Sequence, residues 1–269
     1  MAASSKIKLW KRLTSGAEFE LDEGVRKYLL DQIEETQRVG AISSKSSQSA
    51  PALTTAASEG AGQTEEQTEE QTEVQKLWEA LADTFAILCP DDWPSEGEKP
   101  PLGPSAVWKK VGFQSEDPRK DLRAWGGVAL AALATACGRH KREVRAIVAA
   151  NYPRNENTFP FVCCVINIVQ RLFSLLFHSS SVSAIKAILS GPLQRLPVKK
   201  WKELHAFAVL YSTSADPSIL VSQLAFSVLS AFHSSWLASK ATYMDFNPLL
   251  DRTIETFRIS LIDSTLSLQ

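Results

Sequence analysis

From residue 74 to residue 269, apolar residues recur at intervals of three and four, and the period-two alternation typical of β-strands is scarce. This pattern predicts about eight helices and no strand pair, and therefore an all-α domain with its own hydrophobic core. Most of these helices are bounded by a proline or a glycine. They are expected near residues 77–88, 128–136, 144–151, 159–177, 181–189, 197–209, 217–232 and 248–261.

The run at residues 159–177 is apolar on nearly all sides, so we expect this helix to be central to the core. Asn167, Gln170 and Arg171 interrupt the run, and their burial in lipid would be costly. No stretch of the chain is therefore expected to cross a membrane. The helix that opens at Pro197 is expected to have an inner face made of Trp201, Leu204, His205, Ala208 and Val209.

The N-terminal part of the chain predicts two further segments. Residues 18–39 place Leu21, Val25, Leu29 and Ile33 four positions apart, which indicates an amphipathic helix that either stands alone or docks onto the main body. Residues 40–73 are rich in Ser, Thr, Gln and Glu, and such a segment buries too little apolar surface to order its backbone. We therefore expect an N-terminal extension at 1–39, a disordered acidic linker at 40–73 and a domain at 74–269.

Charge and composition narrow the class of function. Residues 1–73 carry a charge of −5 and residues 74–269 carry +4, so the total of −1 argues against nucleic-acid binding. The cluster Arg139-His140-Lys141-Arg142, with Arg145, and the basic start of the chain leave open a peripheral contact with an anionic membrane. Otherwise the cluster is a solvated helix end. We expect a cytoplasmic protein, with a position beside an internal membrane as the alternative.

Most enzyme signatures are absent from the sequence. It contains no phosphate loop, HExxH, CxxC or GxSxG motif. Cys89, Cys137, Cys163 and Cys164 lie in apolar surroundings and are interpreted as small hydrophobic residues of a reducing compartment. The four histidines are scattered along the chain and are interpreted as structural. We expect no metal and no cofactor.

The segment at residues 108–127, WKKVGFQSEDPRKDLRAWGG, combines aromatic residues, turn formers, paired charges and two adjacent glycines. Asp117-Pro118 is typical of a helix N-cap followed by proline at the first helical position. Arg123 follows Asp121 by two positions and precedes Gly126-Gly127, so we place it at a junction between a turn and a helix. From spacing alone, Arg123 either points outward to a partner or forms a salt bridge with Asp121 or Asp117.

This segment resembles the signature of the ELMO (engulfment and cell motility) domain family. The matching positions are Trp108, Gly112-Phe113-Gln114, Asp117-Pro118, Asp121 and Arg123. A second match is Phe159-Pro160-Phe161 with Ile166-Asn167-Ile168, and a third is Trp236 with Met244-Asp245-Phe246. The resemblance covers about residues 74–260 and implies a single multi-helix ELMO domain.

Stand-alone members of this family that have the arginine are GTPase-activating proteins for Arf-family GTPases, including the Arl members. The resemblance therefore implies that Arg123 acts as an arginine finger on a GTP-bound Arf or Arl protein, rather than in a substrate pocket of this chain's own. It also implies that Asp121 orients Arg123 and that Asn167 hydrogen-bonds the loop from behind. The resemblance further implies that the loop is shaped by Trp108, Gly112, Phe113, Asp117 and Pro118, and that Gln114 makes a polar contact.

The sequence departs from the family pattern beside the arginine. Leu122 replaces the usual Phe, Ala124 replaces the usual Gly, and Lys120 stands where Thr is common. The change to Ala124 is expected to restrict the backbone next to Arg123. The rival interpretation is an adaptor without catalytic function, which binds a small GTPase or its regulators through the same surface in membrane traffic or cytoskeletal signalling.

Overall fold

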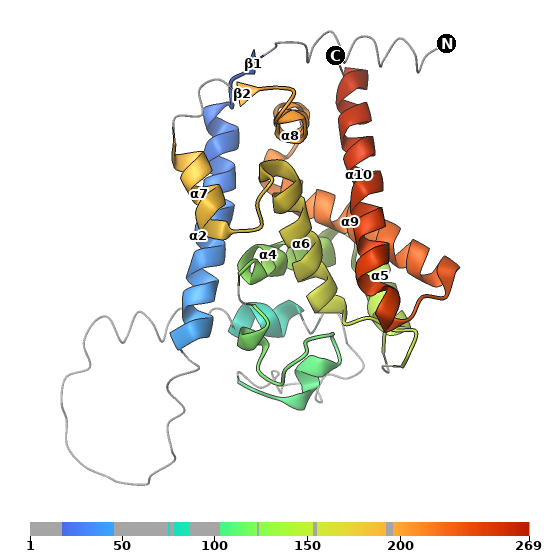
Figure 1. Cartoon of the computed structure of the whole chain (residues 1–269). Helices are drawn as coiled ribbons and strands as arrows, with labels where there is room; N and C mark the ends of the chain where they lie inside the picture. Colours follow the sequence, from blue (N-terminus) through green and yellow to red (C-terminus); the bar gives the residue numbers. More distant parts are fainter. Residues whose placement is uncertain are drawn as a thin grey trace, which may run out of the picture. The chain divides into compact units, whose positions relative to one another are not determined.

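The structure is a computed structural model that describes residues 18–45, 75, 78–84, 86, 103–122, 124–152, 155–191 and 196–268. It is helical almost throughout, which confirms the all-α prediction (Figure 1). The α-helices are α2 (Glu23–Lys45), α4 (Gly126–Arg139), α5 (Lys141–Ala150), α6 (Phe161–Phe177), α7 (Val182–Ser190), α8 (Lys202–Thr213), α9 (Leu220–Ser239) and α10 (Phe246–Leu268). The short 3₁₀ helices are η2 (Ala106–Lys109), η3 (Pro118–Lys120), η4 (Pro217–Ile219) and η5 (Tyr243–Asp245).

The chain forms two compact units. The first contains Met1–Glu34 and Asn167–Gln269, and the second is Glu35–Ile166. Both boundaries fall inside helices, in α2 and in α6. The domain boundaries expected from composition do not coincide with this division and stay a prediction. Most of the predicted linker at 40–73 lies outside the described residues.

In the first unit, the N-terminal helix is docked, which decides between the two alternatives left by the sequence. Arg26 of α2 donates to the main-chain oxygens of Leu189 and Gly191, at 2.5 and 2.8 Å, where α7 ends. The backbone N–H of Val221, at the start of α9, donates to the hydroxyl of Tyr28 at 3.1 Å. These contacts join α2 to segments more than 160 residues away in the sequence.

A short antiparallel sheet also belongs to the first unit. β1 (Glu18–Phe19) pairs with β2 (Leu196–Pro197), with Glu18 opposite Pro197 and Phe19 opposite Leu196. The sequence predicted no strand pair, because two residues are too few to show period-two alternation. Pro197 consequently belongs to β2 rather than opening a helix.

Helix α8 begins at Lys202, and its buried face differs from the predicted one. Leu204 is buried as expected, but Trp201, His205, Ala208 and Val209 are half-buried. The other buried positions are Glu203, Ala206 and Phe207. Glu203 can face inward because Arg258 of α10 lies 3.2 Å from its carboxylate. This ion pair compensates part of the cost of removing the carboxylate from water.

Aromatic packing joins α9 to α10 in the core of the first unit. The ring of Phe246 lies 5.4 Å from that of Phe232 and 6.3 Å from that of Trp236, both in edge-on arrangements. Asn247-Pro248 was predicted to begin the last helix, and α10 begins one residue earlier, at Phe246.

The second unit contains α4, α5, the later part of α2 and the first turns of α6. Gly127 in the first turn of α4 allows a close approach of α2: a Cβ atom there would lie 2.8 Å from the main-chain oxygen of Glu35. A larger residue at this position would push the two helices apart. The predicted short helix at residues 144–151 is observed as α5.

Helix α6 is buried along most of its length, as predicted from its apolar run. By length and composition alone, Phe161–Ser190 and Pro217–Ser239 are apolar enough to cross a membrane, so the expectation that no stretch qualifies is wrong by that criterion. In the structure, 61% of the first apolar window and 33% of the second are buried. Core helices pass the same test, so the finding is weak evidence for a membrane span.

The contact between Tyr28 and α9 generates a stability prediction. Replacing Tyr28 with Phe removes the acceptor of the Val221 N–H, which is buried, and should lower the free energy of unfolding by about 1–2 kcal/mol. Chemical denaturation measures this difference. Lys27→Ala, at an exposed position of the same helix turn, is the control and should change stability little. Equal stability of Tyr28→Phe and the wild type would contradict a docked α2.

Candidate functional site

The loop that precedes position 123 is built around a buried tryptophan. Trp108, in η2, donates from its indole Nε1 to the main-chain oxygen of Gly103 at 2.9 Å. Its ring lies edge-on to Phe113, with 6.3 Å between the ring centroids. Both side chains are almost fully buried. The loop therefore has a small hydrophobic core of its own.

Gly112 brings the loop against the start of α6. Its φ of +93° favours glycine, and a Cβ atom would lie 2.1 Å from the backbone nitrogen of Phe161. At this point the N–H of Val162 donates to the oxygen of Val111 at 3.2 Å, and the N–H of Cys163 donates to that of Gly112 at 3.4 Å. Two otherwise unpaired N–H groups at the helix start are thus satisfied by the loop backbone.

Asp121 closes the loop. One carboxylate oxygen, Oδ2, accepts hydrogen bonds from the backbone N–H groups of Gln114 at 2.9 Å and Ser115 at 3.1 Å. The Gln114 side chain is exposed, as a polar contact with a partner requires. Asp121 therefore fixes the turn seven residues before it. The predicted orientation of Arg123 by Asp121 stays a prediction.

Asp117 and Pro118 form the predicted cap, although the helix that they begin is the three-residue η3. The Asp117 carboxylate accepts from the backbone N–H of Arg119 at 3.1 Å and from its guanidinium at 2.8 and 2.9 Å. That guanidinium also lies 5.3 Å from the ring centre of Trp78, which in turn lies 5.7 Å from the ring of Trp108. Arg119, which the sequence analysis did not single out, thus ties the cap to the core of the loop.

Arg123 lies outside the described residues, but the structure describes both of its neighbours. Leu122 is fully buried, and its Cβ would lie 2.7 Å from a Cβ atom placed on Gly126. Trp125, at the N-cap of α4, is also fully buried. Ala124 is exposed and has a φ of +59°, in the left-handed region that favours glycine. The residue after Arg123 therefore has a backbone conformation that favours glycine, although the residue is alanine.

Asn167 belongs to the first unit, where it is half-buried on α6. Its Oδ1 accepts from Nη1 of Arg171 at 3.2 Å. The same guanidinium lies 2.8 Å from Asp251 and donates to Asn247 at 3.0 Å, both on α10. From sequence, Arg171 is only an interruption of an apolar run, because its partners on α10 are some 80 residues away. A role of Asn167 behind the loop stays a prediction.

Other chemistry finds little support among the described residues. They contain no group of three or more His, Cys, Asp or Glu side chains that could hold a metal ion. Cys137, Cys163 and Cys164 are buried and lie outside any disulfide, and burial raises the pKa of the Cys137 thiol to about 12, so it stays protonated at neutral pH. Burial lowers the pKa of His205 and that of His233 below the usual value. Cys89 lies outside the described residues.

The basic cluster surrounds the junction of α4 and α5. Arg139, Lys141 and Arg142 are exposed there, whereas His140 and Arg145 are half-buried. The exposure suits a solvated helix end and a contact with acidic groups equally well.

The conformation of Ala124 predicts that glycine stabilises this position. A left-handed conformation costs an L-residue about 1–2 kcal/mol, and Ala124→Gly should recover about 0.5–1 kcal/mol after the greater chain entropy of glycine is subtracted. Ala131→Gly, at an exposed position inside α4, is the matched control and should destabilise by about 1 kcal/mol. Urea unfolding measures both changes in the free energy of unfolding. A loss of stability in Ala124→Gly as large as that in the control would contradict the left-handed assignment.

The closure of the loop by Asp121 predicts a local effect on hydrogen exchange. Asp121→Ala removes the acceptor of two backbone N–H groups and should accelerate exchange of the Gln114 and Ser115 amides by about tenfold or more. Asp121→Asn retains one acceptor oxygen, so its exchange rates at these two amides should lie between those of the wild type and Asp121→Ala. Glu116→Ala removes a neighbouring carboxylate that pairs with Lys109 at the surface, and it should leave both amides unchanged. Unaltered exchange in Asp121→Ala would refute the closure.

Comparison with known proteins identifies the family of the chain. A family model described as the ELMO/CED-12 family matches residues 61–250, which is more than half of the chain. ELMO domain-containing protein C of Dictyostelium discoideum is 29% identical over 152 residues, which are 56% of this chain and 22% of that protein. The matched region thus spans about a fifth of that relative. No solved structure matches. The chain belongs to the ELMO/CED-12 family.

Proposed function

We propose that this chain is a GTPase-activating protein for a small GTPase of the Arf or Arl family, and that Arg123 is the arginine finger that it supplies. The observation that carries the proposal is the fixation of the backbone on both sides of position 123. The Asp121 carboxylate closes the preceding loop, and the buried Leu122 and Trp125 anchor the chain next to the arginine. Family membership supports it independently.

The chemistry requires little of the activating protein. Hydrolysis of GTP spreads negative charge over the transferred phosphoryl group and the leaving oxygen, and a guanidinium supplied in trans stabilises that charge. Such fingers accelerate hydrolysis by about 10³ to 10⁵-fold. The GTPase would supply the nucleotide, the magnesium ion and the group that positions the water molecule. This division of labour is compatible with a sequence that has no phosphate loop.

A fixed backbone matters because an arginine side chain loses considerable rotamer entropy when it is ordered. If the main chain at its base moved as well, more of the binding energy would be used to order the loop. In the described neighbours of Arg123, two side chains are fully buried and one carboxylate accepts two backbone hydrogen bonds. This arrangement suits the presentation of a side chain to a partner.

The proposal predicts that activation depends on the guanidinium of Arg123. Wild type should accelerate single-turnover hydrolysis by one or more members of a panel of Arf and Arl proteins loaded with GTP. Arg123→Ala should return the rate to the intrinsic one, and Arg123→Lys should restore little because a single ammonium cannot form the same paired contacts. Arg142→Ala, an exposed arginine at the start of α5, is the matched control in an assay without lipid and should retain the wild-type rate.

The rival function, an adaptor without catalytic activity, gives a different result in the same assay. Binding of GTP-loaded proteins would persist, but hydrolysis would not be accelerated by the wild type, and Arg123→Ala would bind as well as the wild type. Acceleration that survives in Arg123→Ala would contradict the finger while leaving activation itself in place.

A further inference from the structure

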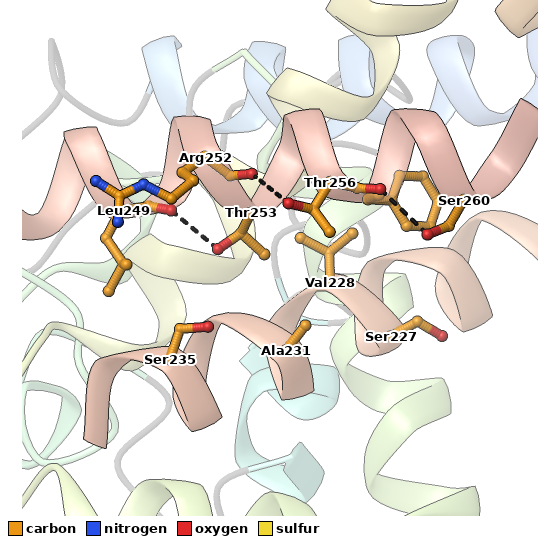
Figure 2. Close-up of a pocket in the computed structure, with 10 residues that line it drawn as sticks. Ser227, Val228, Ala231, Ser235, Leu249, Arg252, Thr253, Thr256 and Ser260 are labelled. Atoms are coloured by element: carbon orange, nitrogen blue, oxygen red, sulfur yellow. Dashed lines mark hydrogen bonds between the residues drawn. The ribbon is translucent and has the colours of Figure 1, made fainter. Parts of the chain in front are cut away.

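A cavity of about 230 Å³ lies between α9 and α10 in the first unit (Figure 2). On the α9 side, it is lined by residues with short side chains that are four positions apart: Ser227, Ala231 and Ser235. On the α10 side, Leu249 and Phe257 contribute apolar surface. Eight residues of helix span about 12 Å, so the cavity follows the two helices for about two turns.

Hydroxyl groups line much of this groove, yet most of their donors are already used. Thr253, Thr256 and Ser260 donate to the main-chain oxygens four residues earlier in α10, at 2.9, 3.0 and 3.2 Å (Figure 2). Ser227 does the same in α9, at 2.9 Å. These groups therefore demand no hydrogen bond from an occupant, and the walls suit apolar side chains.

Arg252 provides the charge at one end of the groove (Figure 2). The acids nearby have other partners: Asp251 pairs with Arg171 at 2.8 Å, and Glu255 pairs with Arg258 at 2.7 Å. Asp245 accepts from the backbone N–H and the hydroxyl of Thr242. In the part of the chain that the structure describes, no carboxylate pairs with the exposed guanidinium of Arg252.

The groove continues past Arg252. A second cavity, of about 180 Å³, shares Leu249 and Arg252 with the first and extends towards η5. On the α9 side, Ser227 and Ala231 are exposed and Ser235 is half-buried. A groove with short, exposed side chains on one side and an exposed cation at one end can receive a protruding segment of a partner.

We propose that the groove between α9 and α10 binds an amphipathic helix of a partner protein. This helix would place apolar side chains one turn apart over Ser227, Ala231 and Ser235, and a carboxylate near Arg252. The short side chains of α9 leave hollows at the spacing of helical turns, into which the ridge of another helix fits. The carboxylate is specified because, among the described residues, Arg252 is the one charged residue that lines the first cavity, while Asp245, which lines the second, already accepts hydrogen bonds from Thr242.

The groove belongs to the first unit, and the inference does not depend on GTPase activation. A helix rather than a small amphiphile is favoured because the exposed Ser227 and Ala231 lie about one helical turn apart on the same side of the groove. A second copy of this chain is the other alternative occupant, and the experiment distinguishes it and a small amphiphile from a partner helix.

The test is selection from a library of helical peptides that have one randomised face, performed on the immobilised full chain. Recovered peptides should carry apolar residues one turn apart and an Asp or Glu at a constant offset from them. Ala231→Arg, which fills the groove, should weaken their binding by at least about tenfold. Arg252→Glu should weaken it similarly, and replacing the acid of the peptide with Lys should restore binding to that variant.

Ala238→Arg is the matched control, since Ala238 is exposed on the same helix but does not line either cavity. Both α9 variants should unfold at the wild-type temperature. Peptides that bind Ala231→Arg as tightly as the wild type, or that show no preference for an acid, would overturn the proposal. If the selection recovers no peptide but dodecanoate binds, the proposal is wrong and the groove is assigned to a small amphiphile. A wild-type dimer that Ala231→Arg dissociates would assign it to a second copy.

Discussion

The backbone contact between Gly112 and the start of α6 is the constraint on which the rest of the loop depends. The carbonyl groups of Val111 and Gly112 accept hydrogen bonds from the first turn of α6, and a Cβ atom at position 112 would overlap the nitrogen of Phe161. The loop therefore adjoins the largely buried helix α6 with no side chain between the two backbones. Movement of this part of the loop would expose N–H groups at the helix start that have no other partner in the helix.

From this anchor, the loop is held by acids that bind backbone groups rather than by buried surface alone. The Asp117 carboxylate accepts a hydrogen bond from the N–H of Arg119, and the Asp121 carboxylate accepts hydrogen bonds from the N–H groups of Gln114 and Ser115. Charge-assisted bonds of this kind are stronger than neutral ones and keep a polar segment ordered without a large core. The acids of the signature thus act first on the conformation of the loop. The presentation of a side chain at position 123 follows from that conformation.

The helices and the capped turn could be predicted from sequence because helical periodicity and cap residues are local signals. The buried face of α8 could not, because it depends on Arg258, which is 55 residues from Glu203 in the sequence. The docking of α2 depends on Leu189, Gly191 and Val221, which are more distant still. Within the loop, Asp121 was recognised as a site residue, but its bonds to Gln114 and Ser115 were not. Spacing along the chain does not report which way a turn folds back.

Ala124 shows how a residue can be held in a conformation that its own side chain disfavours. Alanine disfavours a φ of +59°, so the local preference of the sequence opposes the observed backbone at this residue. The burial of Leu122 and Trp125 on either side outweighs that preference, because burying one such side chain contributes about 1.5–3 kcal/mol. A strained residue that is fixed by its neighbours has few alternative conformations. Alanine at this position therefore costs stability at the turn without giving the backbone beside Arg123 more freedom.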